Sequence, residues 1–226
     1  VGLITVMALT TWSTLNLYTE MRPQHVNIHF YENLDTKKSF VHLSGNYKNV
    51  AASDPEPLIE PLASYVDIEN TKAIASYAPE YKFRYWAESI SSEWKEPSIA
   101  IKARTKNIDS MAVTLKSNRN ASRIILLLPE ASKLKSFNIG SQTINVSPST
   151  SGPFKGYYSI YLNGVYDKQI DLILNFENYT KKTKGYLMDI STKLPGHLDE
   201  IYQARSGIFS PVHRGDQAIL IKTVTI

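Results

Sequence analysis

Residues 25–31 read HVNIHFY, and this stretch decides the fold class. Its apolar residues Val26, Ile28 and Phe30 alternate with polar ones, and a period of two is typical of a strand that buries one face. Turn-forming residues follow at 33–38, and residues 39–43, SFVHL, form a second strand-like segment. The sequence therefore predicts a β-hairpin at the start of a β-rich domain.

Beyond residue 82, strand-like segments recur about every ten residues, a spacing typical of a sandwich or a barrel. Only residues 195–203 favour a further helix. We therefore predict a mainly β fold, an antiparallel β-sandwich with a short N-terminal apolar helix and one or two minor helices. The predicted strands are residues 82–89, 98–105, 111–116, 123–128, 135–139, 142–146, 156–162, 169–175, 185–190 and 217–225.

The composition narrows the classes of function. The chain has 226 residues, 42% of them hydrophobic and 20% charged, so it can bury a sizeable core and is not a disordered protein. Its formal charge of +4 is too small and too evenly spread to indicate a nucleic-acid partner, and none is predicted. The absence of cysteine excludes disulfides, thiolate zinc sites and thiol nucleophiles.

Residues 1–20 are predicted as a separate apolar helix. The first 18 residues carry no charge, but they are short and polar for a complete membrane span of about 20 residues. A signal peptide is disfavoured because the positive n-region is missing. Two interpretations stay open: a buried amphipathic helix, or the end of a transmembrane span that begins before Val1. In the second, Trp12, Tyr18 and Arg22 would suit the membrane interface.

Residues 21–226 are predicted as one β-sandwich domain with a proline-rich connection at 44–81. Prolines at 55, 57, 61 and 79 remove backbone donors and make a central strand there unfavourable.

The histidines give no clear metal site. His25 and His29 share a strand face, but four residues of a strand separate them by roughly 13 Å, too far for one ion. His42 on the partner strand could complete a pair with one of them, although exposed histidines on a polar face are the simpler interpretation. We predict no catalytic and no metal-binding residue in this chain. The motifs of serine hydrolases, phosphate-binding loops and HExxH metalloproteases are missing from the sequence.

Aromatic side chains are the most suggestive local feature, with 14 tyrosines and 3 tryptophans. Exposed aromatics on a sandwich can stack on sugar rings or anchor an interface, whereas buried ones fill the core. The candidates for ligand contact are Tyr85, Trp86, Tyr157, Tyr158 and Tyr161.

The segment Arg22 to Tyr31, RPQHVNIHFY, followed by Asp35, resembles a junction in membrane-anchored family 28 metallopeptidases, which are related to the endoplasmic reticulum metallopeptidases. In that junction the last transmembrane helix gives way to a strand that begins a C-terminal domain outside the cytoplasm. The end of the chain is similar as well, in Pro211, Gly215-Asp216 and the strand from Ala218 to Ile226.

The resemblance implies a parent enzyme that holds two zinc ions with His and acidic residues and uses a Glu as general base. None of those motifs is in these 226 residues, so the chain itself is expected to hold no cofactor. The implied function is that of a non-catalytic, membrane-associated, extracytoplasmic domain, which would lie on the periplasmic side if the protein is bacterial. Its partners would be the peptidase domain before Val1 and the membrane, reached through the N-terminal segment.

Two alternatives stay open. The first is a carbohydrate- or peptide-binding module that uses an aromatic face of the sandwich. The second is a glycosidase or lyase, which would need two carboxylates converging in a cleft at roughly 5 to 10 Å.

Overall fold

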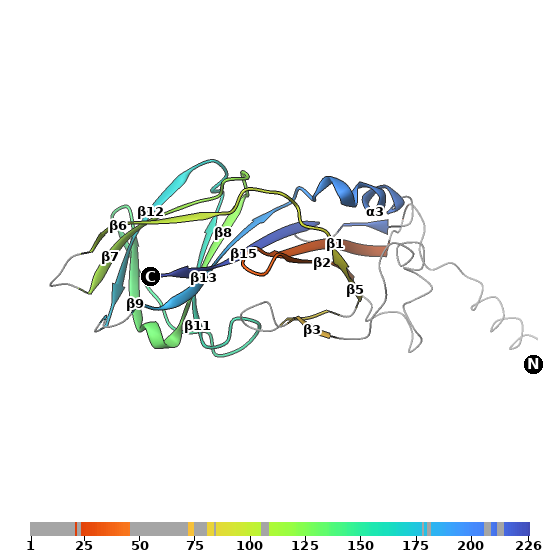
Figure 1. The fold of residues 1–226 in the computed structure, drawn as a ribbon. Coiled ribbons are helices and arrows are strands. Elements are labelled where there is room, and N and C mark those ends of the chain that lie inside the picture. The colour runs from red at the N-terminus through yellow and green to blue at the C-terminus, as the bar shows by residue number, and fades with distance from the viewer. Residues whose placement is uncertain are drawn as a thin grey trace, which may run out of the picture.

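A computed structural model describes residues 21, 24–45, 72–74, 81–83, 85–104, 109–177, 179, 182–205, 209–211 and 215–226. The predicted helix at 1–20 lies outside the described residues, as does most of the connection at 44–81. Within the described part, strands dominate and the predicted β-sandwich is confirmed (Figure 1).

The large sheet has eight strands. In spatial order, seven of them are β11 (Tyr157–Asn163), β8 (Arg123–Pro129), β13 (Lys184–Ser191), β15 (Gln217–Thr225), β1 (Gln24–Asn33), β2 (Lys38–Gly45) and β5 (Tyr85–Ser89). The short β14 (Phe209–Ser210) pairs with β1 outside this path. The predicted hairpin is present as β1 and β2, which pair antiparallel with Tyr31 opposite Phe40.

The small sheet has five strands, in the order β10 (Gln142–Asn145), β9 (Leu134–Ile139), β12 (Gln169–Phe176), β7 (Ser110–Lys116) and β6 (Ser98–Arg104). A separate two-stranded pair joins β3 (Lys72–Ile74) and β4 (Tyr81–Phe83). The helical elements in the described part of the chain are η1 (Glu130–Ser132), η2 (Gly196–Leu198) and α3 (Asp199–Ala204). The last two occupy the predicted helix at 195–203.

One prediction needs correction, because the large sheet is mixed rather than purely antiparallel. β1 runs parallel to β15 and to β14, while its other neighbour β2 is antiparallel. Side-chain alternation reports which face a residue occupies and not the direction of the neighbouring strand, so the sequence could not reveal this pairing.

The two faces of the large sheet have different covers. On the core face, one hydrophobic cluster lies under the small sheet and includes Leu126, Leu174 and Leu187. A second cluster on the same face, with Ile28 and Leu220, packs against Ile201 of α3. Figure 1 shows the small sheet and α3 at opposite ends of the molecule. The small sheet therefore covers only part of the large one, and α3 completes the layer.

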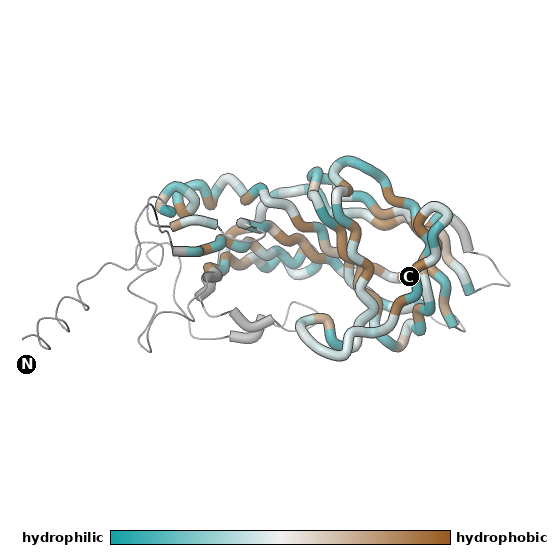
Figure 2. Tube along the Cα trace, turned by 180° about the vertical axis from the view of Figure 1, so that it is seen from behind, coloured by the Kyte–Doolittle hydropathy of each residue, from teal (hydrophilic) through white to brown (hydrophobic). Residues whose placement is uncertain are grey.

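The opposite face, here called the cavity face, carries a third cluster. Its buried members are Tyr31, Phe40, Ile125, Leu127, Met188, Ile190, Ile219 and Ile221. Figure 2 shows how hydrophobic and hydrophilic residues alternate along these strands. Both β8 and β13 bury residues on both faces, and in β8 this gives the continuous apolar run IILLL at residues 124–128.

Candidate functional site

A cavity of about 650 Å³ lies on the cavity face of the large sheet. Its apolar lining comes from β8, β13 and β15, in the side chains of Ile125, Met188, Ile190 and Ile219. The loop before β11 lines it with Ser147, Ser149, Ser151, Pro153 and Phe154, and β11 itself adds Tyr157, Ser159 and Tyr161. This volume falls within the range of pockets that hold small ligands.

Two of the aromatic candidates line this cavity. Tyr157 and Tyr161 are four residues apart on β11, so the period of two places both on the same face of that edge strand. Tyr161 is 50% exposed, and its ring centroid lies 6.4 Å from that of Phe154, with an angle of 55° between the ring planes. The ring centroids of Tyr157 and Tyr186 are 6.2 Å apart, and their ring planes form an angle of 60°. These rings are inclined to one another and do not form one flat platform.

The other three candidates do not reach the cavity or cannot be placed in it. Tyr158 points to the core face, where it is buried in the cluster under the small sheet, and burial raises the pKa of its hydroxyl. Tyr85 and Trp86 belong to β5, and the backbone of Trp86 pairs with that of His42. The side chains of Tyr85 and Trp86 lie outside the described part of the structure.

The polar groups around the cavity were not singled out by the sequence. Arg123 begins β8, and its Nε donates a hydrogen bond of 2.9 Å to Oδ1 of Asn163 on β11. The Ser159 hydroxyl is buried and has no hydrogen-bond partner among the described residues. The described lining contains one arginine and no carboxylate. A serine and an arginine on strands carry no sequence signal for this role, because other lining residues come from β1, β13 and β15, which are distant from both in the chain.

His29 and His42 are brought together across the β1–β2 hairpin. They are paired in register, their ring centroids lie 5.8 Å apart, and Tyr31 contacts both rings. Burial lowers the pKa of His42 to about 3, assisted by the neighbouring His29. Burial also lowers the pKa of His29, although Asp216 acts in the opposite direction. His25 is exposed, and no group of three or more potential metal ligands occurs among the described residues.

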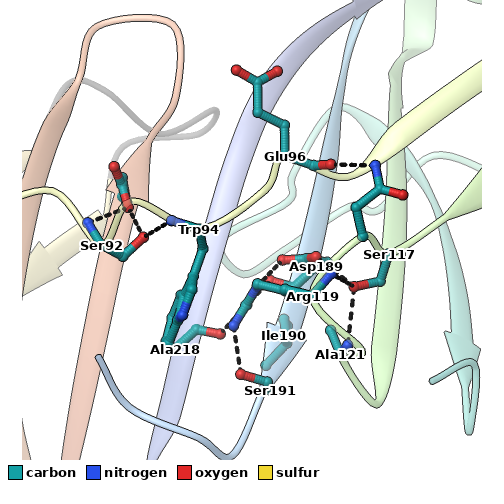
Figure 3. A network of polar contacts seen from close by, with 12 residues as sticks. Ser92, Trp94, Glu96, Ser117, Arg119, Ala121, Asp189, Ile190, Ser191 and Ala218 are labelled. Atoms are coloured by element: carbon teal, nitrogen blue, oxygen red, sulfur yellow. Dashed lines mark hydrogen bonds and ion pairs between the residues drawn. The ribbon is translucent and has the colours of Figure 1, made fainter. Parts of the chain in front are cut away.

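A buried polar network lies on the core face, away from the cavity (Figure 3). Nε of Arg119 donates to Oδ1 of Asp189 at 2.8 Å, and the same guanidinium bonds Ser191 and the backbone oxygen of Ala218. Its Cζ lies 4.6 Å from the centroid of the Trp94 ring. Burial raises the pKa of the Asp189 carboxyl, against the opposing effect of Arg119. This network joins two loops to two strands.

Two further buried carboxylates, those of Glu32 and Asp216, also form hydrogen bonds or ion pairs within the protein. Glu32 on β1 accepts hydrogen bonds from the hydroxyls of Ser91 and Ser92. Asp216 forms a bidentate ion pair with Arg205 at the end of α3 and accepts the backbone N–H of Ile28 at 2.9 Å. None of these three acids lines the described cavity, so a glycosidase-like acid pair is not assembled there.

Among the described residues, no helix is both long and apolar enough to cross a bilayer.

Comparisons with known proteins identify no family. No family model matches the sequence, and no curated protein matches it. One similar solved structure is the Fcho1 Mu homology domain of Danio Rerio with a bound Eps15 peptide. It shares 7% identity, covers 88% of this chain and 92% of that chain, and gives a TM-score of 0.28. A likeness at this level carries no argument about fold or function.

Proposed function

We propose that this chain is a non-catalytic, extracytoplasmic domain of a membrane-bound zinc-dependent exopeptidase, accessory to a peptidase domain that precedes Val1. The sequence basis is the resemblance of residues 22–31 and 211–226 to family 28 metallopeptidases. A membrane contact through residues 1–20 belongs to the same proposal.

One structural observation supports this proposal. The two stretches that carry the resemblance meet in space, although almost the whole chain separates them. β1 pairs in parallel with β15, and the N–H of Ile28 bonds the carboxylate of Asp216. β1 begins at Gln24, only three residues after the apolar segment 1–20. Because β1 lies inside the large sheet, the β-sandwich would stay close to the membrane that residues 1–20 are proposed to contact.

The proposal is tested by measuring zinc content and peptidase activity of the complete chain. We expect no stoichiometric zinc after metal loading and no hydrolysis of aminoacyl nitroanilides. The coding sequence upstream of Val1 should encode several apolar spans, preceded by an α/β domain rich in His, Asp and Glu. Chelator-sensitive hydrolysis by this chain alone, or an upstream sequence without such a domain, would contradict the proposal.

The cavity favours a second candidate, a peptide- or carbohydrate-binding module. Tyr157 and Tyr161 on one strand face are its basis. Sugar rings stack best on flat, exposed aromatic surfaces, whereas the rings here are inclined at 55° and 60° to their neighbours. The geometry therefore suits an apolar side chain better than a pyranose ring. Titration with chito-oligosaccharides distinguishes the two ligand classes.

A further inference from the structure

We propose that the outer edge of β11 binds an extended segment of a partner polypeptide, which adds to the large sheet as a further strand. β11 is the last strand of that sheet and pairs with β8, and in the described part of the chain no strand pairs with its other side. The proposal rests on the backbone of β11 and not on the accessory role proposed above. For the second candidate function, a peptide-binding module, it names the mode of binding.

The backbone groups of β11 divide into two sets. β11 and β8 pair antiparallel without a register shift. At the two ends of this register, the N–H of Glu130 donates to the oxygen of Gly156, and the N–H of Gly164 donates to the oxygen of Ser122. Hydrogen-bonded pairs alternate in an antiparallel ladder, so the even-numbered residues of β11 face β8 with their N–H and C=O groups. The outward set consists of Tyr157, Ser159, Tyr161 and Asn163.

Three residues of the outward set form the open edge. The backbone oxygen of Tyr157 already accepts a hydrogen bond of 2.9 Å from the N–H of Ser149. The backbone groups of Ser159, Tyr161 and Asn163 have no such partner among the described residues. The side chain of Tyr161 is 50% exposed, and Asn163 is exposed as well. This stretch therefore offers a row of donors and acceptors roughly 13 Å long, at the spacing of a strand.

β11 lacks the features that protect exposed sheet edges. Lysine, proline and β-bulges on an edge strand discourage pairing with another chain. At one edge of the small sheet, β6 has a register shift between Ile101 and Ala103, with Lys102 between them. β11 has an unbroken register and contains neither lysine nor proline. An edge without such protection suits a strand that pairs with another polypeptide.

The chemistry of the edge selects an extended peptide as its occupant. N–H and C=O groups at strand spacing are matched by another extended backbone, because it presents the same groups at the same spacing. The loop that bonds Tyr157 through Ser149 closes one end of the open stretch, so about five residues can pair. A second copy joined through five residues would bury far less than the about 1,200 Å² of a stable interface. A single segment can bind such a short edge reversibly.

The side chains next to the edge indicate which residues the segment should carry. Tyr157, Ser159 and Tyr161 line the cavity, so the outward set turns its side chains to the cavity face. A side chain of the segment opposite Tyr161 would pack against this exposed ring, which contacts that of Phe154 at a centroid distance of 6.4 Å. Pairs of aromatic and β-branched residues across strands stabilise a sheet. We therefore expect an apolar, β-branched or aromatic residue at that position of the segment.

The first experiment is amide hydrogen exchange of the complete 226-residue chain without peptide. The N–H groups of Ile160 and Leu162 bond β8 and should exchange slowly, whereas those of Tyr161 and Asn163 should exchange about tenfold faster or more. Equal protection of these four amides would show that the edge is already paired and would overturn the proposal. Protection that appears with rising protein concentration, together with a dimer in sedimentation, would also overturn it, because a second copy would then occupy the edge.

The second experiment is an NMR titration with the peptide acetyl-Lys-Thr-Val-Thr-Val-Thr-Glu-amide, whose β-branched residues favour an extended backbone. We expect binding below millimolar concentration, with slower exchange at Tyr161 and Asn163. Two further peptides carry N-methyl groups, one on both valines and the other on the threonines that precede them. A bound strand turns alternate N–H groups toward β11, so one of the two peptides should bind about tenfold more weakly and the other should bind like the parent.

Variants of the chain test the same backbone contact. Tyr161→Pro removes an N–H that β8 does not use, and proline is tolerated on the open side of an edge strand. It should bind the peptide about tenfold more weakly than Tyr161→Ala, which loses the ring but keeps the N–H. Tyr202→Ala on α3 removes a ring of similar exposure, 49%, and should bind like the wild type. Unchanged thermal unfolding would show that each variant is folded.

Three results would overturn the proposal: unchanged β11 amide signals at millimolar peptide, equal affinities of the two methylated peptides, or equal affinities of Tyr161→Pro and Tyr161→Ala. The exchange and methylation measurements use the unaltered chain, so they decide the question even if Tyr161→Pro does not fold. None of these results would affect the proposed accessory role, which is tested separately by zinc content, hydrolysis and the upstream sequence.

Discussion

The guanidinium of Arg119 lies 2.8 Å from the carboxylate of Asp189 at the boundary between the two hydrophobic clusters of the core face. Asp189 is the Cα partner of Ile124, which belongs to the cluster under the small sheet. On its other side it pairs with Leu220, which belongs to the cluster under α3. The ion pair therefore lies where the part of the large sheet covered by the small sheet meets the part covered by α3.

Loss of Arg119 should be strongly destabilising. Its side chain is 5% exposed and that of Asp189 is fully buried, so Arg119→Gln leaves a buried carboxylate without its cation. We expect the free energy of unfolding to fall by about 3–5 kcal/mol, measured by urea denaturation. Joint replacement, Arg119→Met with Asp189→Leu, should cost less than the sum of the single changes.

The matched control is Lys102→Gln. Lys102 and Asp171 are also 2.8 Å apart, but both side chains are more than half exposed. Water and salt screen such a pair, so little change in stability is expected. An equally large effect at both sites would show that burial does not govern the contribution of these pairs.

The stability of the protein should depend on pH through His42. Burial lowers the pKa of His42 from 6.5 to about 3, so below pH 6.5 the unfolded chain binds a proton that the folded protein excludes. Stability is therefore complete above pH 6.5 and is lost as the pH falls toward 3. Each pH unit in this window should cost up to about 1.4 kcal/mol per histidine. Burial of His29 acts in the same direction.

Denaturation curves at pH 7, 6 and 5 provide the measurement. His42→Phe should flatten the dependence on pH, because its ring has no proton to exclude. An identical slope in wild type and His42→Phe would refute the assignment.

Asp216 should hold β1 and α3 together. Asp216→Ala removes the acceptor of the Ile28 N–H and the partner of Arg205 in one step. We expect a loss of about 3–5 kcal/mol in stability, with faster hydrogen exchange at the Ile28 amide. Asp199→Ala, an exposed acid in the first turn of α3, serves as the control. Unaltered protection of Ile28 in Asp216→Ala would argue against this link.

Gly185 permits close approach of β13 to β8. A Cβ atom at this position would lie 2.4 Å from the backbone oxygen of Leu127 and 2.8 Å from Cδ2 of Leu128. Gly185→Ala should therefore force the strands apart and cost about 1–3 kcal/mol, visible as a lower Tm. Gly196→Ala has no heavy atom within 4 Å of its Cβ and should be tolerated. Equal Tm values for the two variants would count against the close approach.

Side-chain alternation predicted most of the described strands to within a few residues. Residues 185–190 and 217–225 were assigned from their pattern alone and appear as β13 and β15. The same period of two places Tyr157 and Tyr161 on one face of β11 and Tyr158 on the other, although the sequence does not say which face meets the core. The short β14 was not predicted, because two residues are too few to show a period.

The amino-acid sequence by itself determined which segments are strands and which of their side chains share a face, because both follow from local backbone geometry. Only the tertiary structure decided that β1 lies between β2 and β15, and that Arg123, Ser159 and Tyr161 surround one cavity. Such neighbours come from pairings between residues far apart in the chain. Their energies depend on how whole strands and loops pack together, and a local pattern does not contain that information.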